Sequence, residues 1–143
     1  MKIQKIFYAC VIAIAGLLSV GSISSFANNS GNTQYTFNFP SGTNVDYTDP
    51  RPKYDSTSAW MKLKDLSGFA TNPSYTASVV KENYSNFSKT WYYTFSKSNI
   101  NQGVYLSNHA YEDNGYGVKV RIKAVGDGNN SFYGSGDWSP DSI

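Results

Sequence analysis

The stretch of sequence that decides the fold is YGVKVRIKAV, residues 116–125. Apolar and basic side chains alternate along it, with Val118, Val120, Ile122 and Ala124 in one set and Lys119, Arg121 and Lys123 in the other. On a helix the four apolar residues would scatter around the axis, whereas an extended strand places them on one face. The stretch therefore predicts a β-strand with a buried apolar face and a solvated basic face.

Shorter segments with the same two-residue period lie on both sides of this strand. We expect further strands at residues 35–39, 59–64, 75–80, 90–95, 103–106 and 132–138. No segment carries the apolar stripe of a sustained helix. About seven short strands separated by turn residues are typical of an antiparallel β-sandwich, which we predict as a single domain over residues 35–143.

Turn residues mark the ends of the expected strands. The Asn-Gly pair at 114–115 favours a type I′ hairpin turn, and GDGNN at 126–130 is expected to close the next hairpin. DPRP at 49–52 predicts a break in regular structure, because proline lacks the amide hydrogen of a strand ladder. Gly134 and Gly136 weaken the last strand and indicate a bulge or a tight bend.

The first residues have the three parts of a secretory signal peptide. Lys2 and Lys5 form a short basic region, and residues 6–18 are apolar or small. Ser25 and Ala27 then place small residues at the −3 and −1 positions of a cleavage site. We predict cleavage after Ala27. The alternative is an uncleaved membrane anchor, because apolar residues continue past residue 18.

Cleavage would define a secreted mature protein with no stable membrane anchor. Residues 1–27 are then the signal peptide, and residues 28–34 are a polar start that we expect to be disordered. The two leader lysines account for the whole excess of 12 basic over 10 acidic residues, so the mature chain has no bulk attraction for nucleic acid. The single cysteine, Cys10, lies in the leader, which excludes disulfides and thiolate zinc sites from the mature chain.

Few residues in the mature chain point to chemistry. The single histidine, His109, could act as a catalytic base only beside a nucleophile such as the serine of a G-x-S-x-G motif. The sequence GSG at 134–136 matches only a fragment of that motif. Most acidic residues fall in turns, where aspartate commonly bonds the backbone. The loop DGNNS that begins at residue 127 resembles the start of a calcium loop, but Phe132 and Trp138 stand where glycine and glutamate are needed. We therefore expect no enzyme, no metal site and no cofactor.

Exposed aromatic rings are the strongest candidates for a binding function. Trp60 shares its predicted strand face with lysines, Tyr92 lies opposite the main aromatic face of its strand, and Trp138 lies near the C-terminus. Rings displayed in this way stack on sugars or on apolar patches of other proteins. The alternative is that Trp60 and Trp138 fold inward and cap the ends of the sandwich.

The basic face formed by Lys119, Arg121 and Lys123 is a second candidate surface. Such a stripe is ordinarily the solvated side of an amphipathic strand, and edge lysines discourage aggregation between sheets. Alternatively, it contacts an anionic wall polymer or lipid head groups.

The layout resembles a family of small secreted Gram-positive β-rich proteins of unknown function. The resemblance rests on the mature start Ala27-Asn28-Asn29 and above all on a G-x-W-S-P-D-S-like ending, carried by Gly136, Trp138, Ser139, Pro140, Asp141 and Ser142. It implies no catalytic residue. Because some members are encoded near bacteriocin-type export systems, it favours a role in antagonism between bacteria or at their envelope. The chain is also loosely similar to lactococcin-type bacteriocins, which are secreted, cysteine-free and β-structured.

We therefore expect a secreted, non-enzymatic β-sandwich that binds a cell-wall polymer or an envelope protein. The first alternative is a bacteriocin-like toxin acting on the envelope of neighbouring bacteria, and the second is a small hydrolase. The sequence leaves the ligand, the strand order and the oligomeric state open.

Overall fold

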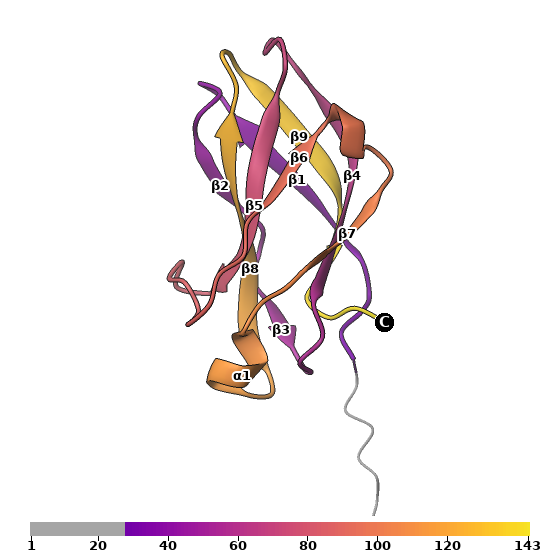
Figure 1. Cartoon of the computed structure of the whole chain (residues 1–143), viewed down its shortest axis with the longest axis vertical. Coiled ribbons are helices and arrows are strands. Elements are labelled where there is room, and N and C mark those ends of the chain that lie inside the picture. Colours follow the sequence, from indigo (N-terminus) through magenta and orange to yellow (C-terminus); the bar gives the residue numbers. More distant parts are fainter. Residues whose placement is uncertain (1–27) are drawn as a thin grey trace, which may run out of the picture.

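Two antiparallel sheets packed face to face make up the fold of residues 28–143, the part of the chain that the computed structural model describes (Figure 1). The predicted signal peptide, residues 1–27, lies outside the described residues. Sheet 1 has the order β1-β9-β4-β7 and consists of β1 (Thr33–Phe39), β9 (Phe132–Ser139), β4 (Ala59–Gly68) and β7 (Gly103–Leu106). Sheet 2 has the order β2-β8-β5-β6 and consists of β2 (Val45–Tyr47), β8 (Val118–Asp127), β5 (Ser74–Lys81) and β6 (Tyr93–Ser96), with β3 (Arg51–Lys53) also paired to β8. The predicted β-sandwich is confirmed.

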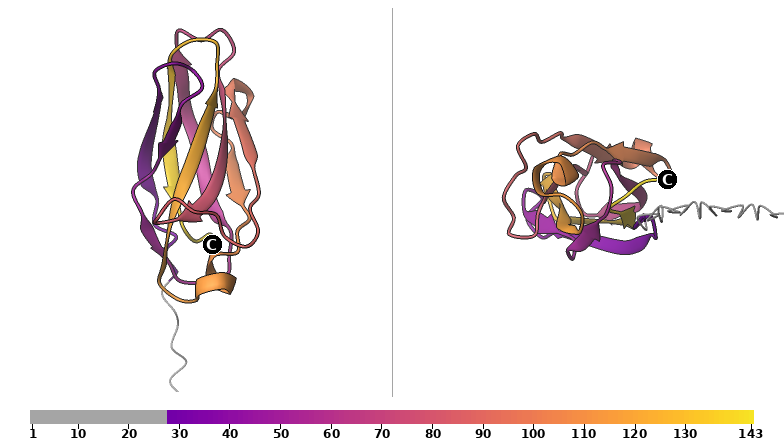
Figure 2. Two further views of the ribbon diagram at one scale, coloured as in Figure 1. Left: turned by 90° about the vertical axis from the view of Figure 1, so that its left-hand side faces the viewer. Right: turned by 90° about the horizontal axis from the view of Figure 1, so that it is seen from below.

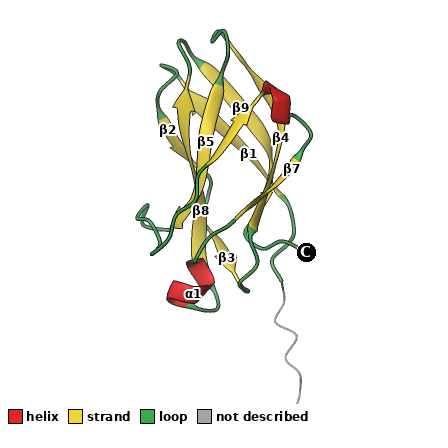
Figure 3. Ribbon diagram, viewed as in Figure 1, coloured by secondary structure: helices red, strands yellow, loops and turns green. Residues whose placement is uncertain are grey.

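The connections carry the chain back and forth between the two sheets. β4 passes to β5, and β8 passes to β9, by loops at one end of the molecule (Figure 2). The expected hairpin at 126–130 is therefore wrong, because β8 pairs with β5 while β9 pairs with β1 and β4. Helical structure in the described chain is limited to a 3₁₀ turn (Lys97–Asn99) and the short helix α1 (Ala110–Asn114), drawn in red in Figure 3.

The expected type I′ turn at 114–115 is the end of α1. Gly115 follows the helix with a φ of 77°, and its amide donates to the carbonyl of Tyr111. Glycine adopts this left-handed conformation without the steric penalty that a Cβ would cause, so the Asn-Gly pair ends a helix here. The chain then enters β8, which does not pair with β7.

Strand β8 has the two faces that its sequence predicts. Val120, Ile122 and Ala124 are fully buried and belong to the core. They meet the inward residues of β5 across an antiparallel register that pairs Ala77 with Ala124 and Val79 with Ile122. The strand thus contributes three aliphatic side chains to the core.

Aromatic rings form a large part of the remaining core. Phe37, Phe39, Tyr75, Phe95 and Phe132 are buried between the sheets, with neighbouring ring centroids 4.6–6.3 Å apart. Offset and edge contacts at such distances add to the energy of burial. These rings join strands of sheet 1 to strands of sheet 2 and so hold the sandwich closed.

The break expected at residues 49–52 is found only in its first half, because residues 48–50 carry no regular structure but β3 begins at residue 51. Arg51–Lys53 form β3, in which Pro52 pairs with Lys119 of β8. β3 is an edge strand, because it pairs only with β8. A proline is tolerated there because the missing amide hydrogen would face away from β8, where there is no further strand to accept it. The sequence does not reveal that this strand lies at the edge of a sheet, so the proline predicted a break there.

The expected disorder of residues 28–34 is also wrong. Thr33 and Gln34 begin β1 and pair with Trp138 and Asp137, and Asn29 is held by hydrogen bonds to distant residues. Polar composition alone did not reveal these partners, of which Pro52 lies 23 residues and Asp141 112 residues along the chain from Asn29.

The strand expected at 90–95 begins later than predicted. β6 starts at Tyr93, so Trp91 and Tyr92 belong to the loop that precedes it. Trp91 is 38% exposed and lies beside the imidazole of His109 at a centroid distance of 5.5 Å.

The irregularity expected near Gly134 and Gly136 falls on the neighbouring strand. The register of β4 against β9 shifts between Leu63 and Asp65. A Cβ on Gly136 would lie 1.9 Å from the carbonyl oxygen of Lys62, so only glycine permits this close approach of the two backbones.

Candidate functional site

A row of three side chains crosses the outer face of sheet 1. The register places Trp60 of β4 between Ser139 of β9 and Tyr105 of β7. The inward neighbours of Trp60, Ala59 and Met61, are fully buried in the core. Because side chains alternate between the two faces of a strand, the indole lies on the outside next to the Tyr105 ring.

A cleft of about 180 Å³ opens beside these two rings. The residues that line it come from the first described residues, from β4 and β7, and from the C-terminal segment: Ser30, Asn32, Trp60, Tyr105, Ser139, Asp141, Ser142 and Ile143. The side chain of Tyr105 is 58% exposed, and Trp60 is partly exposed. The cleft therefore presents two rings and a set of short polar groups to solvent.

Gly103 of β7 sets the position of the Trp60 ring. A Cβ at residue 103 would lie 2.7 Å from Nε1 and 3.2 Å from two carbons of the indole. The ring thus rests directly on the backbone of β7, and a side chain at this position would displace it. The aromatic wall is fixed by the strand beneath it.

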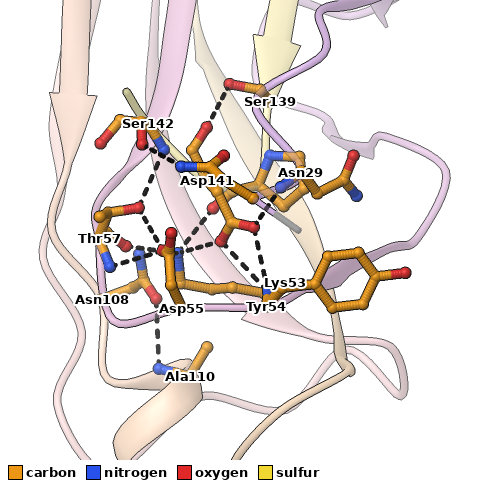
Figure 4. A network of polar contacts seen from close by, with 12 residues as sticks. Asn29, Lys53, Tyr54, Asp55, Thr57, Asn108, Ala110, Ser139, Asp141 and Ser142 are labelled. Atoms are coloured by element: carbon orange, nitrogen blue, oxygen red, sulfur yellow. Dashed lines mark hydrogen bonds and ion pairs between the residues drawn. The ribbon is translucent and has the colours of Figure 1, made fainter. Parts of the chain in front are cut away.

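A buried ion pair underlies the cleft (Figure 4). Lys53 of β3 and Asp141 are both fully buried, with Lys53 Nζ 3.0 Å from Asp141 Oδ1. Lys53 Nζ also donates to the carbonyl oxygens of Pro140 (2.8 Å) and Thr57. All three donors of the ammonium group are therefore used within the protein.

The Asp141 carboxylate forms hydrogen bonds that connect the two ends of the described chain. Its Oδ2 accepts from the backbone amides of Asn29 at 2.8 Å and Tyr54 at 3.1 Å. The Asn28 side chain donates to the carbonyl of Ser142, and the Ser142 amide donates to Thr57 Oγ1. The C-terminal segment, which forms one wall of the cleft, is held in place by this network (Figure 4).

The network keeps Asp141 ionised. Burial by itself would raise the pKa of the carboxyl group, but the hydrogen bonds from Asn29, Lys53 and Tyr54 and the charge of Lys53 outweigh burial and lower the pKa below its ordinary value. The negative charge of Asp141 is thus neutralised locally by Lys53. The remaining lining side chains of the cleft are uncharged.

Trp138 is not exposed to solvent, as a ring that binds a ligand would have to be. It is 1% exposed and packs in the core, with the guanidinium carbon of Arg51 5.4 Å from its ring centroid. Trp138 shares its face of β9 with Phe132, because the two residues are an even number of positions apart. The prediction that Trp138 binds a ligand is therefore wrong. Its ring folds inward, which was the alternative considered from the sequence.

Tyr92 does not join Trp60. Its side chain is 65% exposed, but it lies in the loop before β6 and does not line the cleft. Of the three rings singled out from the sequence, the structure places only Trp60 at the cleft.

The basic face is only partly free. Arg121 donates to the carbonyls of Glu82 and Thr48 and lies 4.8 Å from the centroid of the Tyr84 ring. Lys119 forms an exposed ion pair with Glu82 at 3.1 Å. These residues with Lys123 lie on β8 in sheet 2, whereas the cleft lies on sheet 1. Arg121 thus anchors the loop after β5 and is not available as a free cation.

Ser88, His109 and Asp113 form a small polar cluster near α1. The Ser88 hydroxyl and backbone amide both donate to the Asp113 carboxylate at 2.6 Å, while Ser88 Oγ and His109 Nδ1 are 3.4 Å apart. In a catalytic triad the carboxylate orients the histidine. Here it accepts from the serine instead, and these bonds together with the nearby His109 and Lys81 lower the pKa of Asp113. The cluster tethers the loop after β5 to α1.

Several residues of the cleft were missed by sequence reasoning. Tyr105 lies in a strand that was expected, and its alternation with the buried Leu106 was a usable signal. Asn32 gave no signal, and Ser142 stood out only as part of the G-x-W-S-P-D-S-like ending, which did not indicate that it lines a cleft.

A family model described as a protein of unknown function (DUF2712) matches residues 23–142. No curated protein and no solved structure matches the chain. Within residues 28–143, no helix has the length and apolar character to cross a membrane, and no three acidic or histidine side chains gather as metal ligands.

Proposed function

The chain belongs to the DUF2712 family, and we propose that it is a secreted, non-catalytic protein that binds a component of the cell envelope through the cleft beside Trp60 and Tyr105. The single observation that carries this proposal is the pairing of two partly exposed rings above a set of short neutral polar groups. Aromatic rings with a few fixed polar groups are the usual composition of ligand sites.

The rigidity of the cleft supports a binding role. Trp60 and Tyr105 lie on paired strands, and Gly103 holds the indole against the sheet. The third wall, the C-terminal segment, is fixed by Asp141 and its hydrogen bonds. A site whose parts are already in place loses little conformational entropy when a ligand binds.

The non-catalytic part of the proposal rests on how the polar groups are used. Asp141, the charged residue of the cleft, is committed to Lys53 and to two backbone amides. The Asp113 carboxylate is bonded to Ser88 and does not orient His109. Both carboxylates therefore serve the fold rather than a reacting group.

Secretion is proposed from the leader of the sequence, with cleavage after Ala27. The measurement is the mass of the protein recovered from culture medium. We expect a chain that begins at Asn28, which retains the contacts of Asn28 and Asn29 with the C-terminal segment. Recovery only in the membrane fraction, with residues 1–27 attached, would contradict secretion.

Binding is tested by sedimentation of the purified mature protein with isolated cell envelopes. We expect the protein to pellet with the envelopes, and Trp60→Ala and Tyr105→Ala to weaken the association about tenfold or more. Tyr92→Ala is the matched control, since Tyr92 is exposed but outside the cleft. Equal losses for Tyr92→Ala and Trp60→Ala would contradict the proposed site, and clearing of bacterial lawns would indicate a toxin instead.

A further inference from the structure

We infer that the ligand of the cleft is a glycan strand, bound through an uncharged pyranose ring that stacks on Trp60 beside Tyr105. This inference rests on the proposed function and names the chemical class of its ligand. It is carried by the charge, the size and the surface surrounding the cleft.

The charge of the cleft disfavours an anionic polymer. Among its lining residues only Asp141 has a charged side chain, which is fully buried and already paired with Lys53. No lysine, arginine or histidine lines it.

Phosphate and carboxylate groups are recognised by arginine, lysine or clustered backbone amides. Lys62 and Lys64 share the outer face of β4 with Trp60, but neither lines the cleft, and Lys64 is paired with Asp137. The basic residues of β8 lie on the other sheet. An uncharged group fits the cleft better.

The chemistry of the lining matches a sugar ring. The C–H hydrogens of a pyranose carry partial positive charge, and the face of an aromatic ring carries partial negative charge, so the two attract. The ring hydroxyls need hydrogen-bond partners, and Ser30, Asn32 and Ser142 place side chains around the rings. A wholly apolar ligand would leave these groups without partners.

The size of the cleft indicates one sugar unit. Its volume of about 180 Å³ is below the roughly 300–1,000 Å³ of ordinary small-molecule pockets. The outer face of sheet 1 continues past the cleft to a second hollow of about 190 Å³, which is lined by polar residues and by the ion pair of Lys64 with Asp137. A strand of linked sugars can therefore lie along the sheet with one unit in the cleft.

The experiment separates the envelope into chemical fractions. Isolated envelopes are delipidated, treated with protease and treated with cold hydrofluoric acid, which hydrolyses phosphodiester bonds, so that the glycan residue remains. The intact phosphodiester-linked polymer is extracted from a second portion of the envelopes that has not been treated with the acid. Binding of the mature protein to each fraction is measured at about 0.05 M and about 0.5 M salt, because screening weakens attraction between exposed charges.

We expect binding to the glycan residue to equal binding to the intact envelope, and to change less than about twofold with salt. Binding that is lost after any of the three treatments, or that moves to the phosphodiester polymer, would overturn the inference while the proposed envelope binding stands. Failure to bind the intact envelope would overturn the proposed function itself.

Three variants connect the binding to the cleft. Trp60→Ala is expected to lower affinity for the glycan residue about tenfold or more, whereas Trp60→Phe, which keeps a ring, should stay within about threefold of the original protein. Gly103→Ala should lower affinity by displacing the indole, although the new methyl group lies outside the cleft. Circular dichroism checks that each variant is folded. Unchanged affinity in folded Trp60→Ala would overturn the inference.

Discussion

Lys53 and Asp141 show how two opposite charges are accommodated inside a small β-sandwich. Both side chains are fully buried, yet in the described part of the chain no buried side-chain nitrogen or oxygen lacks a hydrogen-bond partner. Burial of charges is costly unless they are paired and fully bonded. The conspicuous C-terminal sequence Ser139-Pro140-Asp141-Ser142 thus has a structural role, which is to close the network that holds one wall of the cleft.

Removal of one charge of this pair should destabilise the protein strongly. We expect Asp141→Asn to lower the free energy of unfolding by about 3–5 kcal/mol, because the buried Lys53 keeps only the longer ion pair to the partly exposed Asp55, 3.9 Å away. Lys53→Met should have a cost of the same order. In the double variant the two effects should be less than additive, as measured by urea unfolding. Strict additivity would show that the pair is not coupled.

The hydroxyls of Tyr35 and Tyr75 form a second buried polar contact, 2.9 Å apart in the aromatic core. We expect Tyr35→Phe to cost about 1–3 kcal/mol because Tyr75 loses its partner, while the double change to phenylalanine should be nearly neutral. Urea unfolding of the three variants measures this. A double variant as unstable as the sum of the single variants would contradict it.

The same pair predicts behaviour at high pH. Burial raises the pKa of Tyr35 to about 12, and burial together with Tyr35 raises the pKa of Tyr75 further. Because folding favours the neutral phenols, their contribution to stability is present below pH 10 and is lost as pH rises above it. Phenolate absorbance should show these two tyrosines ionising only with unfolding. Their ionisation near pH 10 in the folded protein would contradict this.

At the level of single elements, the alternation of side chains predicted a strand and its buried face wherever one face is apolar and the other is polar. In β8 the apolar and basic sets identified the strand and its faces directly. In β9 the inward positions between Phe132 and Trp138 are glycines, so the pattern did not reveal that Trp138 faces the core. β3 was missed because its proline opposes a strand locally, and only the edge position makes it acceptable.

The pairing of β4 with β9 depends on the absence of a side chain at Gly136. We expect Gly136→Ala to cost about 3 kcal/mol or more, because the new Cβ would collide with the carbonyl of Lys62 and separate the two strands. Gly31→Ala is the control, since nothing lies within 4 Å of that position. Thermal unfolding measures both, and equal stability of the two variants would contradict the close approach.

At the scale of the whole molecule, the sequence predicted the two-sheet architecture but not the contacts that complete the site. Asn28 and Asn29 reach the C-terminal segment across more than a hundred residues of sequence. Such pairings depend on strand order, and strand order depends on packing between sheets that local patterns do not encode. Trp60 could be placed on an outer face from its own strand, whereas the walls around it could not be predicted.

The contacts of Asp141 with the two chain ends should make the stability of the folded protein depend on pH in the acid range. The pKa of Asp141 is lowered in the folded protein, so its contribution is present above the ordinary carboxyl value of about 4 and is lost as pH falls further. The difference in Tm between the original protein and Asp141→Asn should therefore be largest above about pH 5 and shrink toward pH 2. A difference that stays constant over this range would contradict the assignment.

The most direct test of the proposed binding site is a nuclear magnetic resonance titration of the tryptophan indole N–H groups. The chain has three tryptophans, in three distinct settings: Trp60 at the cleft, Trp91 beside His109 and Trp138 in the core. With glycan strands released from the envelope, we predict that the Trp60 resonance shifts saturably while those of Trp91 and Trp138 stay in place. A shift confined to Trp91, or no shift of Trp60 at saturating glycan, would contradict the account.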